Sequence, residues 1–268
     1  ESLHLVILDE NEDSDNDGIN DRDEGYSDSD GDGIVDYLDN DSNTTRLPTS
    51  DDNEPMQTTV GLVMSLGAHA SAAGGATSIG AGLTVEALAN EVPAGSADTS
   101  DNDYVMTGLV YNFIISGLAQ QGDSVTVILP LPSDTALSEN THYRKYNTRD
   151  GWYNFVEDES NSISSATSDA NGNCPAANDD VYSQGLTQGD NCIELVIEDG
   201  GPNDADFTIN GSVEDPGAFV VEQQNQAPTP VKKKSGGGSM DWLTLFILGV
   251  VMCARTRRLA SNILEKNR

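Results

Sequence analysis

The stretch YVMTGLVYNFII, residues 104–115, is rich in β-branched and aromatic side chains. Such side chains fit the pleated, half-buried surface of a β-strand. Runs of the same kind recur along the chain and are separated by turn clusters such as QQGD, TRDG and EDGGPND. The other runs are TVGLVMSL (59–66), SVTVIL (124–129), GWYNFV (151–156), CIELVIE (192–198) and GAFVV (217–221). The pattern predicts short strands joined by tight turns.

Helical patterning is weak by comparison. No amphipathic segment is longer than about 12 residues, and TVEALANEV (84–92) is the best candidate for a short helix. We therefore expect a mainly β fold, an antiparallel β-sandwich over residues 58–221. The polar stretch 43–57 predicts a connector, and the small residues of 72–82 predict a loop.

Charge is distributed unevenly along the 268 residues, which carry 45 Asp and Glu against 13 Lys and Arg, a formal net charge of −32. Residues 1–231 hold 43 of the acids and five basic residues, whereas residues 232–268 hold eight basic residues and two acids. A surface this acidic repels phosphate backbones, so we expect no nucleic acid partner. Multivalent cations would relieve its self-repulsion, which makes calcium the first ligand to consider.

An acidic stretch near the start contains an internal repeat. DSDNDGINDRDE (13–24) and DSDGDGIVDYLD (28–39) align with Asp at positions 1, 3, 5 and 9, Gly at 6, Ile at 7 and an acid at 12. Side-chain oxygens at these acidic positions and the carbonyl at position 7 can converge on one calcium ion, while Gly at 6 permits the sharp turn. The candidate ligands are Asp13, Asp15, Asp17, Ile19, Asp21 and Glu24 in the first loop, and Asp28, Asp30, Asp32, Ile34, Asp36 and Asp39 in the second.

Only residues 25–27 separate the two loops, so the flanking helices of an EF-hand do not fit. Without metal the crowded carboxylates should keep the segment extended, and metal binding should supply its folding energy. Ile19 and Ile34 should give the loops a small apolar contact. The spacing resembles the thrombospondin type 3 repeat, a calcium-wrapped module without EF-hand helices, over residues 9–42. The alternative is a solvated acidic spacer.

The chain has three cysteines. Cys174 and Cys192 lie in a polar region and would form a disulfide in an exported protein, contributing about 3 kcal/mol through the denatured state. The alternative is a pair of reduced, buried thiols. Cys253 lies inside an apolar run, and the spacing of the three does not resemble a zinc site.

A basic cluster stands out in the segment HYRKYNTRDGW, residues 142–152. Arg144, Lys145 and Arg149 are the only basic residues between Arg46 and Lys232. In so acidic a region we expect them to be internal salt-bridge partners rather than a ligand site.

A second notable segment, residues 192–217, combines an apolar run with a turn rich in side-chain oxygens. Its Asx side chains could hold a further calcium ion, or could cap turns by bonding to their own backbone. The candidates for this third metal site are Asn203, Asp204, Asp206, Asn210 and Asp215.

Several short motifs together resemble a bacterial surface domain known as the choice-of-anchor U domain. The motifs are YRKY (143–146), GW (151–152), CP (174–175), Tyr182, GL (185–186), GDNC (189–192) and IEDGGPNDAD (197–206), followed by NG and DPG. The resemblance implies a domain that occurs with different C-terminal anchoring signals. Phe207 departs from the pattern, because a glycine is expected after DAD.

The sequence predicts no catalytic site. His4, His69 and His142 are the only imidazole bases, and the chain contains no GxSxG, HExxH or phosphate-loop motif. We expect a non-enzymatic protein that acts in display or adhesion. The alternative is the accessory part of a secreted hydrolase whose catalytic domain lies upstream of Glu1, since the absence of an initiator Met predicts a piece of a longer precursor.

The C-terminal region predicts a flexible Gly/Lys/Pro linker over residues 222–239 and a membrane helix with a basic tail over residues 240–268. The apolar run WLTLFILGVVMCA, 242–254, is short for a membrane span but ends in arginines that suit the cytoplasmic side. The acidic body would then lie outside the inner membrane. A permanently anchored single-span protein is one interpretation.

The glycine run, the short apolar helix and the basic cluster together resemble the GlyGly-CTERM sorting signal of Gram-negative bacteria. The resemblance implies cleavage by a rhomboid-type intramembrane protease, called rhombosortase, and release to the cell surface or medium by type II secretion. Residues that oppose helix formation favour an extended scissile segment. The candidate processing residues are Gly236, Gly237, Gly238 and Ser239.

Overall fold

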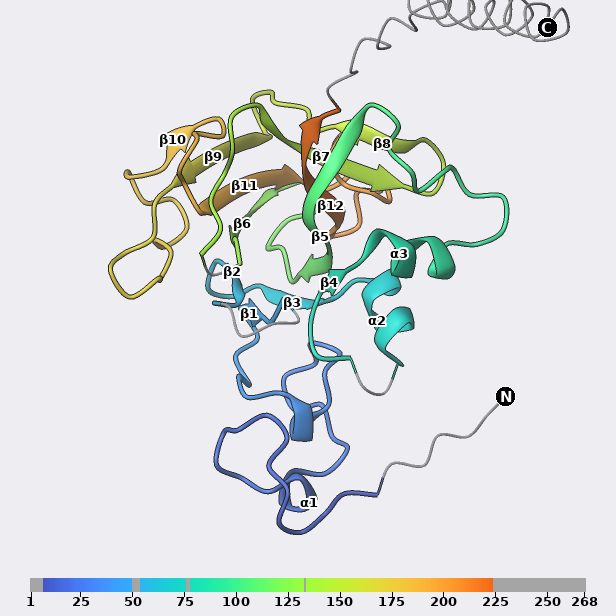
Figure 1. The fold of residues 1–268 in the computed structure, drawn as a ribbon, viewed down its shortest axis with the longest axis vertical. Coiled ribbons are helices and arrows are strands. Elements are labelled where there is room, and N and C mark those ends of the chain that lie inside the picture. The colour runs from blue at the N-terminus through green and yellow to red at the C-terminus, as the bar shows by residue number, and fades with distance from the viewer. Residues whose placement is uncertain (1–6, 50–53, 76–77, 133, 224–268) are drawn as a thin grey trace, which may run out of the picture. The chain divides into compact units, whose positions relative to one another are not determined.

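The computed structural model describes residues 7–49, 54–75, 78–132 and 134–223. Within them the chain is mainly β, and its strands pair antiparallel in two sheets (Figure 1), which confirms the mainly β, antiparallel part of the prediction. The β11 sheet has the order β1 (Arg46–Leu47), β2 (Met56–Thr58), β6 (Ser124–Pro130), β11 (Cys192–Glu198), β9 (Ser162–Ala166) and β10 (Ser183–Gln184). The β12 sheet has the order β3 (Val63–Leu66), β5 (Tyr104–Ser116), β12 (Ser212–Glu222), β7 (Thr141–Asn147) and β8 (Gly151–Asn154), with β4 (Gly82–Leu83) paired to β5.

The stretch 104–115 lies in β5, an interior strand of the β12 sheet. β5 pairs with β12 from Ser116 opposite Ser212 to Tyr104 opposite Glu222, with one irregularity near residue 219. Its other edge pairs with β3 and β4. One strand therefore holds together segments from the first half and the very end of the described chain.

Both sheets contribute to one hydrophobic core. Val127 and Leu195 of the β11 sheet and Phe113 and Val213 of the β12 sheet belong to the same cluster and are wholly buried. Alternate residues of a strand point to opposite faces, so each run presents one apolar face to this cluster. A fully buried side chain of this kind contributes about 1.5–3 kcal/mol relative to an exposed one.

Helix α2 (Ala68–Gly74) is joined to β5 through Asn112. The Asn112 side-chain oxygen accepts a hydrogen bond from the Ala70 amide at 2.9 Å, and the Gly67 amide donates to the Asn112 carbonyl at 2.8 Å. A Cβ at Gly67 would collide with the Asn112 side chain, so only glycine permits this approach.

Helix α3 (Val85–Glu91) confirms the helix predicted at 84–92. Thr84 is its N-cap, and its hydroxyl accepts a hydrogen bond from the Ala87 amide at 3.0 Å. Leu88 is buried in the shared core. The remaining short helices, α1 (Asp21–Glu24) and η1 (Asp36–Leu38), lie in the acidic loops.

Two expectations about irregular segments were wrong in part. The predicted connector 43–57 contains β1 and β2, whose Leu47 and Met56 are wholly buried, and the predicted loop 72–82 begins inside α2. Strands of two or three residues place one side chain in the core, which is too little to produce a periodic pattern. β7 and β9 were also missed, since THYRKYN and SISSA lack the apolar density of the other strands.

Cys174 and Cys192 are joined by a disulfide, the first of the two alternatives that the sequence leaves open. Cys192 begins β11 and is wholly buried. The Cys174 amide donates to the Glu54 side chain at 2.6 Å, so the bridge connects β11 to the segment that precedes β2.

Among the described residues, no helix is long and apolar enough to cross a membrane. The description ends at Gln223. The predicted linker beyond that point, the predicted membrane helix of 240–268 and the candidate processing residues 236–239 therefore lie outside the described residues.

Asp199, which directly follows β11, braces a turn through its backbone contacts. Its carboxylate accepts hydrogen bonds from the amides of Gly122 and Gly211, both at 2.8 Å, and from the amide of Asn210 at 3.0 Å. The side chain is 1% exposed. Burial opposes the charge, but the three N–H donors outweigh it and hold the pKa of Asp199 below its ordinary value.

We expect Asp199→Asn to lower the free energy of unfolding by about 1.5–3 kcal/mol at neutral pH, because hydrogen bonds to a charged acceptor are lost. A carboxyl whose pKa is depressed in the folded state stabilises above its unfolded pKa, and this contribution disappears as pH falls through the folded value. The difference between wild type and variant should therefore shrink in acid. Urea unfolding at about pH 7 and about pH 3 measures it. Asp180→Asn, at an exposed site, is the control, and an equal loss at both pH values would contradict the assignment.

Candidate metal centre

The two acidic loops have the same internal hydrogen bonds. In the first, the Ile19 amide donates to Asp17 Oδ1 at 2.7 Å, and in the second the Ile34 amide donates to Asp32 Oδ1 at 2.7 Å. These bonds join positions 5 and 7 of each copy. The repeat seen in the sequence is therefore also a repeat of conformation.

Position 6 is glycine in both copies for a conformational reason. Gly18 and Gly33 have φ angles of 96° and 95°, in the left-handed region that side chains disfavour. The turn directs the Gly18 amide to Asp13 Oδ2 at 3.2 Å and the Gly33 amide to Asp28 Oδ2 at 3.1 Å. The glycine thus folds each loop back onto its first aspartate.

Three carboxylates meet in each loop. Each residue offers one oxygen, and within a group these oxygens all lie within 4.8 Å of one another. The groups are Asp13, Asp15 and Asp17, and Asp28, Asp30 and Asp32. Several of their oxygens are buried and have no hydrogen-bond partner among the described residues, a costly state for a carboxylate. These oxygens are Asp13 Oδ1, Asp15 Oδ2, Asp30 Oδ2 and Asp32 Oδ2.

The acids at position 12 face the same groups, as the ligand pattern predicts. Burial and the neighbouring charges of Asp15 and Asp17 raise the pKa of Glu24 to about 7. Burial and the charge of Asp30 raise the pKa of Asp39 to about 6. A cation held among these carboxylates would offset the repulsion that raises both values.

The acids at position 9 have a role that the ligand pattern did not predict. Asp21 accepts hydrogen bonds from the Ser14 amide and hydroxyl at 2.7 and 2.8 Å, and Asp36 accepts the same pair from Ser29 at the same distances. Both carboxylates therefore brace the first turn of their loop. The signal was present in the sequence, because serine occupies position 2 in both copies.

The expected contact between Ile19 and Ile34 was wrong. Ile34 is 1% exposed and belongs to the core cluster of the two sheets, whereas Ile19 is 49% exposed. The second loop docks on β3, where the Leu66 amide donates to the Asp32 carbonyl at 2.7 Å. The large apolar core beneath β3 competes successfully for Ile34, because burying it there removes more apolar area from water.

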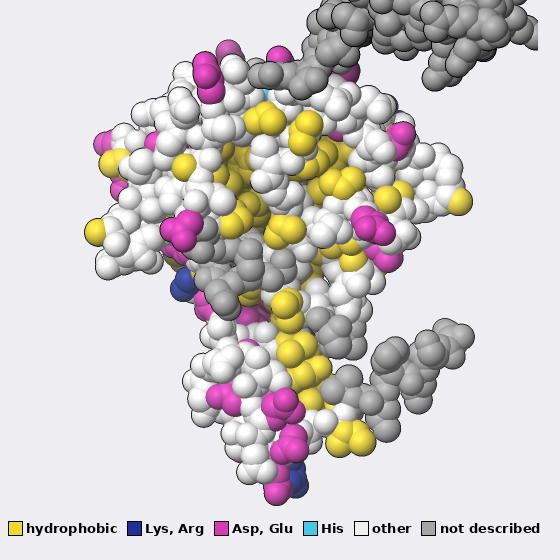
Figure 2. Space-filling view, viewed as in Figure 1, with side chains coloured by type: hydrophobic (Ala, Val, Ile, Leu, Met, Phe, Trp, Pro, Cys, Tyr) yellow, Lys and Arg dark blue, Asp and Glu magenta, His cyan; other side chains and the backbone are white. Residues whose placement is uncertain are grey.

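Acidic side chains gather over the N-terminal loops beside a strip of hydrophobic side chains (Figure 2). Within the loops, the side chains of Ile19 and Tyr26 are exposed and that of Tyr37 is buried. Tyr26 and Tyr37 pack edge to face, with ring centroids 5.7 Å apart. A contact from the Asn40 side chain to the Asp15 carbonyl at 3.4 Å links the end of the second loop to the first.

The residues considered for a third metal site are engaged in hydrogen bonds within the protein. Asn203 donates to the Val156 carbonyl and accepts from the Val156 amide, both at 2.8 Å. Asp204 accepts from the amides of Gly200 at 2.8 Å and Glu214 at 3.0 Å. The bond from Gly200 to Asp204 is a local turn contact of the kind expected from Asx side chains, whereas Asn203 connects its turn to Val156, 47 residues earlier in the chain.

The rest of this turn follows the same pattern. Asp206 accepts from the Thr208 amide and from the Asn210 side chain, both at 2.7 Å. Phe207, which stands where the resemblance expects glycine, has a φ of 55° and takes the left-handed conformation. The Arg149 guanidinium lies 4.5 Å from the centre of its ring, a cation–π contact that favours this position.

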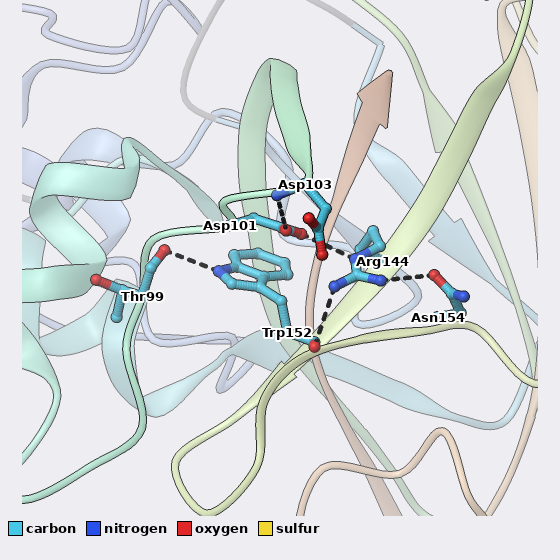
Figure 3. Close-up of polar contacts among 6 residues, drawn as sticks. All are labelled: Thr99, Asp101, Asp103, Arg144, Trp152 and Asn154. Atoms are coloured by element: carbon cyan, nitrogen blue, oxygen red, sulfur yellow. Dashed lines mark hydrogen bonds and ion pairs between the residues drawn. The ribbon is translucent and has the colours of Figure 1, made fainter. Parts of the chain in front are cut away.

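Arg144 and Lys145 of the basic cluster are internal salt-bridge partners, as predicted, whereas Arg149 pairs with Asp150 at the surface. Arg144 Nε donates to Asp101 at 2.9 Å, Nη1 to the Asn154 side chain at 2.6 Å and Nη2 to the Trp152 carbonyl at 3.1 Å (Figure 3). The Trp152 indole donates to the Thr99 carbonyl at 2.8 Å. The network attaches the segment before β5 to β7 and β8.

Lys145 and Asp215 form an ion pair in the interior. Lys145 Nζ lies 2.5 Å from Asp215 Oδ1, and neither side chain is exposed. The Tyr143 hydroxyl donates to the same oxygen at 3.2 Å. Asp215, a candidate ligand of the third metal site, therefore has a cationic partner within the protein.

Comparison of the chain with protein-family models, with curated proteins and with solved structures finds no match. The resemblances drawn from short motifs therefore stay predictions.

We expect Arg144→Lys to lower the free energy of unfolding by about 1.5–3 kcal/mol. Lysine keeps the positive charge, but it lacks the planar guanidinium group that donates to three acceptors at once. Arg149, whose ion pair with Asp150 at 2.6 Å is exposed, provides the matched control. Arg149→Lys should change stability by less than about 0.5 kcal/mol. Chemical denaturation measures both, and equal effects would show that Arg144 has no special structural role.

Proposed function

We propose that this chain is a non-enzymatic calcium-binding protein of the bacterial cell envelope, whose N-terminal loops each hold a calcium ion. The observation that carries the proposal is the duplicated geometry. The two loops have equivalent hydrogen bonds from backbone amides to aspartate side chains, and in each loop three carboxylates lie close together. Each loop also leaves buried carboxylate oxygens without a hydrogen-bond partner among the described residues.

The donor set favours calcium over other metals. The loops offer carboxylate and carbonyl oxygens and contain no histidine or cysteine, and hard oxygen donors suit Ca²⁺ rather than Zn²⁺. Each ion would take oxygens from positions 1, 3, 5, 7 and 12. The ligands would be Asp13, Asp15, Asp17, the Ile19 carbonyl and Glu24, and Asp28, Asp30, Asp32, the Ile34 carbonyl and Asp39. Asp21 and Asp36 would hold the loops in shape through Ser14 and Ser29.

Calcium in the second loop would stabilise the β domain as well as the loop. Ile34 lies in the shared core, and the Asp32 carbonyl accepts the Leu66 amide. Any ligand that binds only the folded state raises the free energy of unfolding in proportion to the logarithm of its concentration. The first loop has no such connection through Ile19, which is half exposed.

The proposal includes a place for the protein. The β-sandwich of the choice-of-anchor U type would be displayed outside the cell for adhesion, and the segment 240–268 would be its sorting helix. Rhombosortase would cut near residues 236–239 after export, with release by type II secretion. The disulfide between Cys174 and Cys192 supports an oxidising compartment.

Calorimetric titration of the metal-free protein with calcium should give saturable heat with two ions bound. Asp15→Ala and Asp30→Ala, at equivalent positions of the two loops, should each remove one binding event, because alanine offers no side-chain oxygen. Magnesium is the control, because it requires tighter octahedral geometry and keeps its waters. Wild-type protein that gives no saturable heat at millimolar calcium would refute the calcium proposal.

Calcium should also raise the melting temperature of the β domain, and Asp30→Ala should reduce this rise more than Asp15→Ala. The physical reason is the contact of the second loop with the core through Ile34. Trp152 fluorescence reports on the β domain if Trp242 is first replaced by Phe, since the chain has two tryptophans. Equal effects of the two variants would contradict the coupling.

Sorting can be tested separately by mass spectrometry of protein recovered from cells that carry a rhomboid-type protease. The mature chain should end near Gly237, and replacement of residues 236–238 by leucine should abolish the cut, because helix-forming residues oppose an extended scissile segment. Mature protein that ends at Arg268 would exclude processing while leaving calcium binding unaffected.

A further inference from the structure

The Lys145–Asp215 pair differs from the other ion pairs of the described chain. Both side chains are 0% exposed, whereas Arg144 and Asp101, the next most buried pair, are 11% and 5% exposed. Lys145 lies in β7 and Asp215 in the neighbouring strand β12. The pair therefore lies between two adjacent strands and away from water.

The two side chains are close enough for a hydrogen bond, but their geometry is not that of one. Lys145 Nζ is 2.5 Å from Asp215 Oδ1, yet neither Nζ nor Asp215 Oδ2 has a partner with hydrogen-bond geometry among the described residues. A buried ion pair is stable only when its remaining protons and lone pairs are satisfied. The amine instead lies against the carboxyl group without the alignment of a donor.

Burial shifts the pKa of each group in the direction of its uncharged form. Burial lowers the pKa of Lys145 against the opposing effect of Asp215, and burial raises the pKa of Asp215 against the opposing effect of Lys145. Transfer of one proton from the ammonium to the carboxylate gives a neutral amine beside a neutral carboxylic acid. These are the reactive forms for amide formation, because the amine is then a nucleophile and the acid an electrophile.

We propose that Lys145 and Asp215 condense to an intramolecular amide that links β7 to β12. Lys145 Nζ attacks Asp215 Cγ, and the new N–C bond forms as the C=O electrons move to Oδ1. A proton passes from nitrogen to the departing Oδ2 hydroxyl, the C–Oδ2 bond breaks, and one water leaves. The reaction requires no oxidant or other reactant.

Two neighbouring residues favour the attack. The Tyr143 hydroxyl donates to Oδ1, where negative charge develops during the attack, and burial keeps its pKa well above the ordinary value, so that it remains a donor. Gly217, opposite Lys145 in the strand pair, leaves room for both groups, since a Cβ there would lie 2.7 Å from Asp215 Oδ1. Strand pairing holds the reacting groups together, which removes most of the entropic cost.

The position of the bond suggests its use. β12 is the last described strand before the C-terminal region, so tension applied through that region reaches β12 first. An amide to β7 would pass the force to a covalent cross-link instead of to strand hydrogen bonds alone. This use depends on the proposed anchoring, but the bond itself does not.

Peptide mapping of the full chain tests the bond directly. After reduction and alkylation of the disulfide and complete denaturation, trypsin should release segment 145–149 still attached to segment 150–232, because Lys145 is no longer a cleavage site and Asp215 lies in the second segment. The branched product should be lighter than its two parts by one water. Recovery of the free segment 146–149, with cleavage after Lys145, would overturn the proposal.

Two variants separate this bond from other losses of water, such as succinimide formation at Asp–Gly sequences. Lys145→Arg keeps the positive charge but cannot form this amide, so its mass should equal the sequence mass. Asp215→Asn should form the same bond with loss of ammonia in place of water. A Lys145→Arg protein that still lacks one water would place the modification elsewhere and refute the assignment. Tyr143→Phe should slow the appearance of the branched peptide without changing its identity.

Discussion

β5 and β12 share a hydrogen-bonded ladder that runs from Ser116 and Ser212 to Tyr104 and Glu222. β3 and β4 pair with β5, and β7 pairs with β12, while β8 is attached to the ladder through β7. The ladder joins residues about a hundred positions apart, so its formation must overcome a large loop-closure entropy. The wholly buried side chains on its inner face offset that cost.

Charge is the second constraint on the molecule. Arg22, Arg46, Arg144, Lys145 and Arg149 are the five basic residues of the described chain, and each lies in an ion pair. Two of these pairs are largely buried, so the protein uses its few cations to hold strands and loops together rather than to balance its surface. Of the described basic residues, only Arg22 belongs to the two acidic loops. Under the calcium proposal, cations from solution would neutralise the remaining carboxylates of these loops.

The sequence predicted the strands that contain many apolar residues and the loops whose acidic residues and glycines are regularly spaced. Residues 104–115 and 192–198 were identified as strands because their side chains are suited to a buried pleated surface. Gly18 and Gly33 were identified because position 6 of the repeat requires a sharp turn, and both take the left-handed conformation in the structure. β7 was missed because Arg144 and Lys145 interrupt its apolar pattern, and their acidic partners lie tens of residues away in the chain.

The sequence by itself therefore determined a mainly β chain with a duplicated acidic loop, since these properties depend on local composition and spacing. Only the tertiary structure decided which of two residues at equivalent positions of the sequence pattern contacts the core, and which acidic residue pairs with a lysine. Ile19 and Ile34 occupy the same position in the repeat, but only Ile34 meets the core, because β3 lies beside the second loop. Asp215 could equally have been a metal ligand in the sequence, and it became the partner of Lys145 because strand register brings β12 beside β7. Local pattern cannot distinguish such residues, because the difference lies in what packs against them.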